Sequence, residues 1–144
     1  MSSGDVAAIS RVHRAACLIA YRFMAWDHPL EEIEPWYAGK FPGWDFARVA
    51  TVEDSVVGYL GATGGMIDDL FITPAFQSRG IGRTLLAAQL ARGIRPVDLE
   101  VFAENLPARR LYEAFGFVEM ARFWTATDGA MELRCRLGRE GSRP

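Results

Sequence analysis

Hydrophobic residues near the start of the chain recur at alternating spacings of three and four. The first run of them consists of Ile9, Val12, Ala16, Ile19, Phe23 and Trp26. This spacing places them on one face of a helix, which we predict over residues 5–26. A short second helix is predicted over residues 31–38, and a loop rich in turn-forming residues follows over 39–44.

Beyond residue 45 the pattern changes to short, β-rich segments bounded by turn formers. These segments predict strands over residues 46–52, 56–62, 66–73, 97–102, 117–127 and 130–137. Asp128-Gly129 is a strong hairpin turn between the last two. Helices are predicted over 80–92 and after Asn105. The order of elements predicts a mixed α/β (α+β) fold in a single domain over residues 1–144.

A loop over residues 77–82 leads from an apolar strand directly into an amphipathic helix. Gly80 and Gly82 allow the backbone to approach a ligand closely, because no Cβ stands in the way. The unpaired N–H groups and the dipole of the helix start favour a phosphate or pyrophosphate. Leu85 stands where a dinucleotide-binding loop needs its third glycine, and no Gly-Lys-Ser/Thr follows, so neither a dinucleotide-binding nor a Walker loop is indicated.

A second segment, residues 105–117, reads as a capped amphipathic helix. Asn105 is a good N-cap, Pro107 is tolerated in the first turn, and Gly116 can end the helix in a left-handed conformation. The apolar face consists of Ala108, Leu111, Tyr112 and Phe115.

Together the two segments resemble the GNAT superfamily, the acetyl-CoA-dependent N-acetyltransferases. The first matches the Gln/Arg-x-x-Gly-x-Gly/Ala signature through Gln77, Gly80 and Gly82. The second matches a later family motif through Asn105, Ala108, Leu111, Tyr112, Gly116 and Phe117. The resemblance is specific over residues 66–117 and topological elsewhere. It implies the GNAT fold, a mixed central sheet flanked by helices.

Family members usually begin with a strand, but the four residues before Asp5 leave little room for one. We therefore expect the first strand to be missing. The uncovered sheet edge predicts a homodimer, because unpaired edges favour association.

The resemblance implies acetyl-CoA as cosubstrate and no metal. The pantetheine arm would pair with the strand residues Leu70, Phe71 and Ile72. The pyrophosphate would lie on the loop and helix start formed by Gln77, Ser78, Arg79, Gly80, Ile81, Gly82 and Arg83. Asn105 would bind the pantetheine or order the strand end, with capping alone as the alternative. Arg109 and Arg110 are weaker candidates for the adenosine 3′-phosphate.

Tyr112 corresponds to the family tyrosine that protonates the coenzyme A sulfur, although it could also only pack against the cofactor. A phenol with pKa near 10 is a reasonable donor to a thiolate, whose own pKa is near 8 to 9. For the base we predict Asp68, which shares strand parity with Leu70 and Ile72, whereas Asp69 points the other way. Glu100 and Glu104 are rivals, and water could relay the proton instead.

The acceptor site is expected between the first two helices, their loop and the last hairpin. The aromatic residues of these segments, with one histidine, are Trp26, His28, Trp36, Tyr37, Phe41, Trp44, Phe123 and Trp124. They could line a pocket for an apolar or cationic amine, or equally form core. We predict acetylation of a small-molecule amine. The alternatives are a protein N-terminal or lysine acetyltransferase and a non-catalytic acetyl-CoA sensor.

Charge and composition limit the classes of binding partner that we expect. A formal net charge of −2 gives no electrostatic case for nucleic acid or membrane binding. No apolar run approaches the roughly 18 residues that a membrane span requires, and the N-terminus lacks the features of a signal peptide, so we expect a cytoplasmic protein. Cys17 and Cys135 lack metal-ligand spacing, and Cys135 reads as a buried thiol. Lys40 is the only lysine and hence the one side chain open to self-acetylation.

Overall fold

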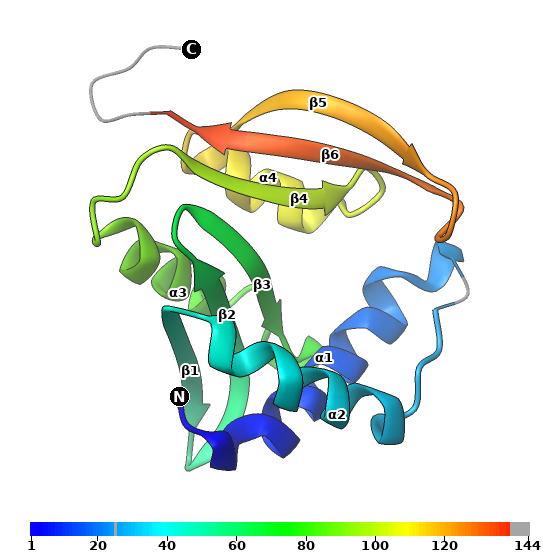
Figure 1. The fold of residues 1–144 in the computed structure, drawn as a ribbon, viewed down its shortest axis with the longest axis vertical. Coiled ribbons are helices and arrows are strands. Elements are labelled where there is room, and N and C mark those ends of the chain that lie inside the picture. Colours follow the sequence, from blue (N-terminus) through cyan, green and yellow to red (C-terminus); the bar gives the residue numbers. More distant parts are fainter. Residues whose placement is uncertain (25, 139–144) are drawn as a thin grey trace.

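The computed structural model describes residues 1–24 and 26–138 of the chain (Figure 1). Two helices come first, α1 (Val6–Ala20) and α2 (Leu30–Lys40). The predicted first helix was too long, since α1 is closed by Tyr21 and followed by a short 3-10 turn, Arg22–Met24. At this helix end the Tyr21 ring packs edge-on against Phe102, with centroids 5.0 Å apart.

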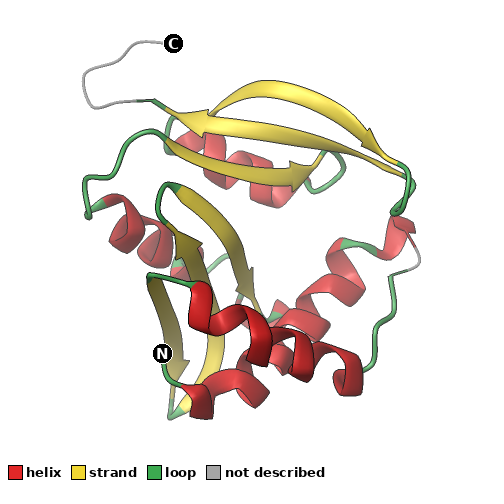
Figure 2. Ribbon diagram, viewed as in Figure 1, coloured by secondary structure: helices red, strands yellow, loops and turns green. Residues whose placement is uncertain are grey.

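The sheet has six strands within the described residues. They are β1 (Phe46–Val52), β2 (Ser55–Thr63), β3 (Met66–Ile72), β4 (Val97–Phe102), β5 (Val118–Thr125) and β6 (Ala130–Leu137). Their spatial order is β1-β2-β3-β4-β6-β5. The pairing of β3 with β4 is parallel and the other pairs are antiparallel, which confirms the predicted mixed sheet (Figure 2). The remaining helices are α3 (Ile81–Leu90) and α4 (Leu106–Ala114).

The helices cover the two faces of the sheet. Helices α1 and α2 lie on one face of β1–β3, and α3 and α4 lie on the opposite side of the sheet (Figure 1). The larger core, which includes Leu86, Leu99 and Leu133, is under α3 and α4. The smaller core joins Ile9 and Tyr37 to the strand residue Tyr59. Two separate cores thus hold the two helical layers on one sheet.

Strands β3 and β4 part almost as soon as they meet. They pair at Met66 with Asp98 and at Ile67 with Leu99, and then diverge (Figure 1). The sheet is therefore split into a β1-β2-β3 half and a β4-β6-β5 half. From residue 68 to 72, the β3 backbone has no strand partner on its β4 side within the described residues.

A β-bulge lies at the point where the strands part. Gly61 pairs with Asp69 and Ala62 with Ile67, so Asp68 is an extra residue in β3. The bulge resets the alternation of side chains. Leu70 packs with the core under α3 and α4, whereas Phe71 packs with the core under α1 and α2. The strand parity that grouped Asp68 with Leu70 and Ile72 was therefore wrong.

Among the described residues, β1 is an edge strand of the sheet. The homodimer stays a prediction. Across the described residues, no helix combines the length and apolar character needed to traverse a lipid bilayer.

Candidate active site

The loop before α3 presents backbone N–H groups at one place. Ser78 has φ +64° and Gly80, the N-cap of α3, has φ +84°, and no side chain of the described residues caps the helix. Left-handed residues beside a helix start turn successive N–H groups inward, which creates an anion-binding concavity. The Gln77 amide donates to the Ile72 carbonyl oxygen at 2.9 Å and so ties the loop to the end of β3.

The two motif glycines serve different purposes. Gly80 has open space where a Cβ would point, so its positive φ is what requires glycine. At Gly82 an added Cβ would lie 3.3 Å from Leu111 Cδ2, so this glycine allows α3 to pack against α4. Arg79 and Arg83 lie against the Phe76 and Phe115 rings, with their guanidinium carbons 4.9 and 5.8 Å from the ring centroids.

A cavity of about 900 Å³ occupies the gap between β3 and β4. Its walls include the free β3 edge, the loop and start of α3, one side of α4, and the end of α1. Of the predicted cofactor-binding residues, those on this wall are Leu70, Phe71, Ile72, Gln77, Ser78, Gly80, Ile81, Gly82, Arg83, Asn105 and Tyr112. Residues far apart in sequence thus line one space of the size that ligand sites have.

Helix α4 contributes Tyr112 to the same cavity. Asn105 caps the helix, its Oδ1 accepting from Ala108 N–H at 3.3 Å, as predicted. Burial raises the pKa of Tyr112, so its hydroxyl keeps its proton across the physiological range. Arg109 donates to the Ala103 carbonyl oxygen at 2.8 Å and lines a separate small cavity, whereas Arg110 is exposed and lines neither.

Both candidate aspartates of β3 line the cavity, in different environments. Asp68, in the bulge, is exposed and accepts a hydrogen bond from Thr63 Oγ1 at 3.0 Å. Asp69 is 7% exposed and its Oδ2 lies 3.3 Å from Lys40 Nζ. Burial raises the pKa of Asp69, which Lys40 and the Tyr37 hydroxyl partly oppose. A carboxyl with a raised pKa binds a proton more readily, which general acid–base catalysis can use.

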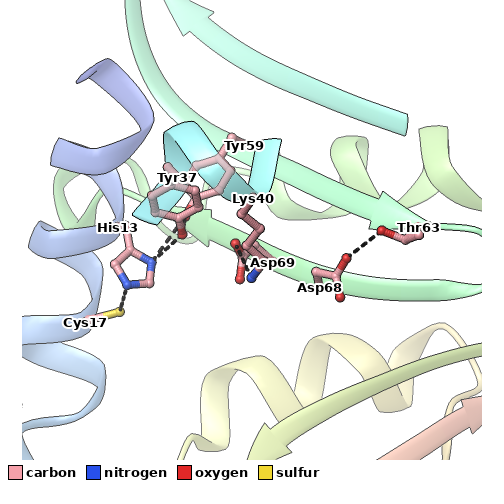
Figure 3. A network of polar contacts seen from close by, with 8 residues as sticks. All are labelled: His13, Cys17, Tyr37, Lys40, Tyr59, Thr63, Asp68 and Asp69. Carbon is pink, nitrogen blue, oxygen red and sulfur yellow. Dashed lines mark hydrogen bonds and ion pairs between the residues drawn. The ribbon is translucent and has the colours of Figure 1, made fainter. Parts of the chain in front are cut away.

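Near Asp69, a polar network joins Tyr37 of α2 and Tyr59 of β2 to His13 and Cys17 of α1 (Figure 3). The His13 ring contacts the Tyr37 hydroxyl through Nδ1 at 2.7 Å and Cys17 Sγ through Nε2 at 3.6 Å. The Tyr37 hydroxyl also hydrogen-bonds to that of Tyr59. Burial lowers the pKa of His13 to about 4, so the ring is neutral at pH 7. Sequence reasoning missed this network because it assembles residues from α1, α2 and β2.

Three glutamates complete the acidic side of the cavity. Glu100 and Glu104, named from sequence, line it, and so does Glu132 on β6, which sequence reasoning missed. Burial and the nearby Glu100 raise the pKa of Glu132. Its position opposite Phe102 in the β4–β6 pairing explains the placement, and strand pairing is not visible in sequence.

The aromatic pocket predicted from sequence is not what lines the cavity. None of the eight predicted residues, all within the described chain, is on its wall. Tyr37 and Trp44 are core, while Trp36, Phe123 and Trp124 are exposed. The aromatic residues that do line it are Tyr21, Phe23, Phe71, Phe76, Phe102 and Tyr112. Tyr21 and Phe23 lie at and just after the C-terminal end of α1, and Phe71 and Phe102 lie on the parting strands β3 and β4.

Both cysteines are buried, as predicted for Cys135, and burial raises the pKa of each thiol. No cluster of three or more metal-ligating side chains is present in the described part of the chain.

Comparison with known proteins identifies the fold and family. The Acetyltransferase (GNAT) family model matches residues 15–117. The chain belongs to the GNAT acetyltransferase family. Solved structures show the same fold. The ribosomal-protein-S18-alanine N-acetyltransferase from Escherichia coli superposes with a TM-score of 0.72 at 20% identity, over 96% of this chain and 90% of that one. A Salmonella typhimurium acetyltransferase with its cofactor acetyl-CoA gives 0.73 at 20% identity, over 100% and 94%.

Sequence relatives of this GNAT chain are named for two kinds of acceptor. The mycothiol acetyltransferase of Beutenbergia cavernae is 44% identical over 64 residues, 42% of this chain and 22% of the relative. The ribosomal protein bS18-alanine N-acetyltransferase of Haemophilus ducreyi is 35% identical over 71 residues, 44% of this chain and 49% of the relative. The matched part of the chain thus spans about a fifth of one and half of the other.

The geometry of this GNAT domain fits coenzyme A. A cleft between parting parallel strands offers a free backbone edge to an extended arm, and an uncapped helix start at its end suits a pyrophosphate. Both features meet in one cavity together with Tyr112.

Proposed function

We propose that the chain transfers the acetyl group of acetyl-CoA to a primary amine. The observation that carries the proposal is the parting of β3 and β4, which opens a cavity between a free strand edge, the start of α3 and Tyr112. Bound acetyl-CoA would supply an activated thioester. The β3 backbone from 70 to 72 would orient the arm, and the N–H groups of residues 78–83 would hold the pyrophosphate.

In this proposal Tyr112 donates a proton to the departing sulfur. Its hydroxyl retains the proton at neutral pH, because burial raises its pKa. The amine arrives as an ammonium and must lose a proton before it can attack. A carboxylate of the cavity takes that proton, directly or through water. Asp68 remains our sequence-based candidate, with Asp69, Glu100 and Glu104 on the same wall.

A small-molecule amine is the acceptor we favour. The acceptor end of the cavity combines acidic side chains with Tyr21, Phe23 and Phe102, which suits a cationic amine with apolar parts. An N-terminal amino group of a protein is the second candidate. It is favoured by the similarity to two proteins named as ribosomal-protein alanine N-acetyltransferases.

Release of coenzyme A thiol from acetyl-CoA, measured with a panel of amines, tests the function. Alkyl and aryl amines should support release, and a peptide beginning with alanine tests the second acceptor class. If no amine or peptide raises thiol release above background while calorimetry shows tight acetyl-CoA binding, the chain is a sensor and the proposal fails.

The base can be assigned with matched variants. Asp68→Asn and Asp69→Asn remove one charge each at adjacent positions with little change of shape. The variant that lacks the base should lose kcat/KM most at low pH, where the amine most needs help to lose its proton. Equal profiles for both variants and the wild type would leave Glu100, Glu104 or a water relay as the route.

A further inference from the structure

Lys40 places an alkylammonium group inside the cavity. It ends α2, and its side chain is 26% exposed. The Nζ atom lies 3.3 Å from Asp69 Oδ2 and 4.2 Å from the centroid of the Trp36 ring (Figure 3 shows the pairing with Asp69). Trp44 lies farther away, with its centroid at 5.8 Å. A carboxylate and an aromatic face are the partners that a cationic amine prefers.

The Lys40 ammonium lies in the cavity in which we propose that acetyl transfer takes place. Lys40 and Asp69 line the same cavity as Leu70, at the free edge of β3, and as Tyr112 on α4. Leu70 directly follows Asp69, so the carboxylate that pairs with Lys40 is adjacent to the edge proposed to hold the thioester arm. Lys40 is also the only lysine among 144 residues. The side chain thus lines the cavity in which the proposed acetyl transfer would take place.

We propose that Lys40 Nζ is acetylated by the acetyl-CoA bound in its own molecule. This inference rests on the proposed acetyl transfer. Asp69 takes one proton from the Lys40 ammonium, and the neutral nitrogen attacks the thioester carbonyl carbon. The C–N amide bond forms and the C–S bond breaks. Tyr112 gives its proton to the thiolate and regains one as the nitrogen releases its second proton, so acetyl-CoA and lysine become free coenzyme A, acetyl-lysine and one proton.

The modification would change the acceptor end of the site. An acetylated Lys40 carries no positive charge, so the ion pair with Asp69 and the contact with the Trp36 face are both lost. Asp69 then stays buried without its cation, which favours the protonated carboxyl. Self-acetylation would thereby couple acetyl-CoA supply to the charge state of the cavity.

Mass spectrometry of the whole chain incubated with acetyl-CoA tests the inference. We expect the mass of one acetyl group to be gained and peptide mapping to place it on Lys40. Lys40→Arg keeps the charge but should gain nothing at this position. The rate per molecule should not depend on protein concentration, because the reaction is intramolecular.

A matched control separates catalysis from spontaneous acetylation. Arg11 is exposed on α1, outside the cavity, so Arg11→Lys adds a second, solvated lysine to the same molecule. Proximity should make Lys40 react at least ~10-fold faster than the added lysine. Tyr112→Phe should slow the reaction at Lys40 and leave that of the added lysine unchanged.

Several outcomes would overturn the inference. Equal rates at both lysines would show spontaneous chemistry, and a rate that rises with protein concentration would show transfer between molecules. An unmodified Lys40 in a protein that acetylates the amine panel would refute self-acetylation and leave the proposed function intact. Failure to bind acetyl-CoA in calorimetry would refute both.

Discussion

The two ends of the cavity are built in different ways. The end proposed for the pyrophosphate comes from one continuous segment, residues 72–83, and depends on backbone: a left-handed Ser78, a left-handed Gly80 and an uncapped helix start. The acceptor end depends on side chains from α1, α2, β3 and β4, among them Lys40, Asp69 and Phe102. A backbone site has its signature in local sequence, whereas a side-chain site needs the whole fold before it exists.

Tyr112 lines the cavity that contains both ends, and removal of its hydroxyl should have the largest effect. Tyr112→Phe keeps the ring and its packing on Phe117, whose centroid is 5.8 Å away, and deletes only the hydroxyl. We expect kcat to fall by roughly 10²-fold, in the range of acid catalysis, with acetyl-CoA affinity nearly unchanged. Steady-state kinetics and calorimetry measure the two quantities. A wild-type rate with chemistry limiting would reduce Tyr112 to a packing role.

At the pyrophosphate end, backbone should matter more than charged side chains. Gly80→Val puts a β-branched residue at φ +84° and should weaken acetyl-CoA binding by at least ~10-fold, about 1.4 kcal/mol. Arg79→Gln removes a guanidinium that already lies over Phe76 and should cost less. Calorimetry at low and high salt compares the variants, with circular dichroism as the control for folding. A greater loss for Arg79→Gln would reverse the comparison.

The same contrast explains what sequence could predict. The order of helices and strands, the mixed sheet and the Asn105 cap follow from local patterns and the family resemblance, and the structure agrees. The extra residue at Asp68 was not predicted, because a bulge is defined by the pairing partner across the sheet. With the bulge unseen, strand parity grouped Asp68 with Leu70 and Ile72, whereas Asp69 does point the other way, as predicted, toward Lys40 on α2.

The acceptor end was missed for a related reason. Trp26, Phe41 and Trp44 were plausible pocket residues on composition, yet they pack in the α1–α2 core. Tyr21 and Phe102, which do line the cavity, are 81 positions apart and come together only because α1 ends at Tyr21. No local spacing contains that information.

At the acceptor end, the buried carboxylate should cost stability. The folded-state pKa of Asp69 is raised above its ordinary 3.8, so the folded state favours the protonated form. The stabilisation is present below pH 3.8 and is lost as the pH rises through the folded-state pKa. At pH 7 Asp69→Asn should therefore raise the free energy of unfolding, on the order of 1 kcal/mol, while impairing activity. Denaturant unfolding at pH 4 and pH 7 measures the change.

The opposite result at Asp69 would assign a different role to its ion pair. If Asp69→Asn destabilised the protein at pH 7, the ion pair with Lys40 would outweigh the cost of burial, and the acceptor end would be held together by charge. Lys40→Arg then separates the ion pair from the cost of burial. It keeps a positive charge beside Asp69, so a stability held by charge should survive this substitution.

Asp98 is a matched carboxylate outside the cavity. Its substitution should change the free energy of unfolding in the opposite direction from that of Asp69, and by the smallest amount. Asp98 lies on β4 and accepts from Arg136 Nε at 2.7 Å and Nη2 at 3.0 Å, and these hydrogen bonds lower its pKa. Its stabilisation is present above the ordinary pKa of 3.8 and is lost as the pH falls through the folded-state value. Because solvent screens this pair, Asp98→Asn should cost only about 0.5 kcal/mol at pH 7 and less at acid pH, with activity unchanged.

Denaturant unfolding of Asp98→Asn beside Asp69→Asn should give free-energy differences of opposite sign at pH 7. If both variants were destabilised alike, the two carboxylates would be equivalent ion-pair partners. Burial would then not distinguish Asp69 from a surface carboxylate.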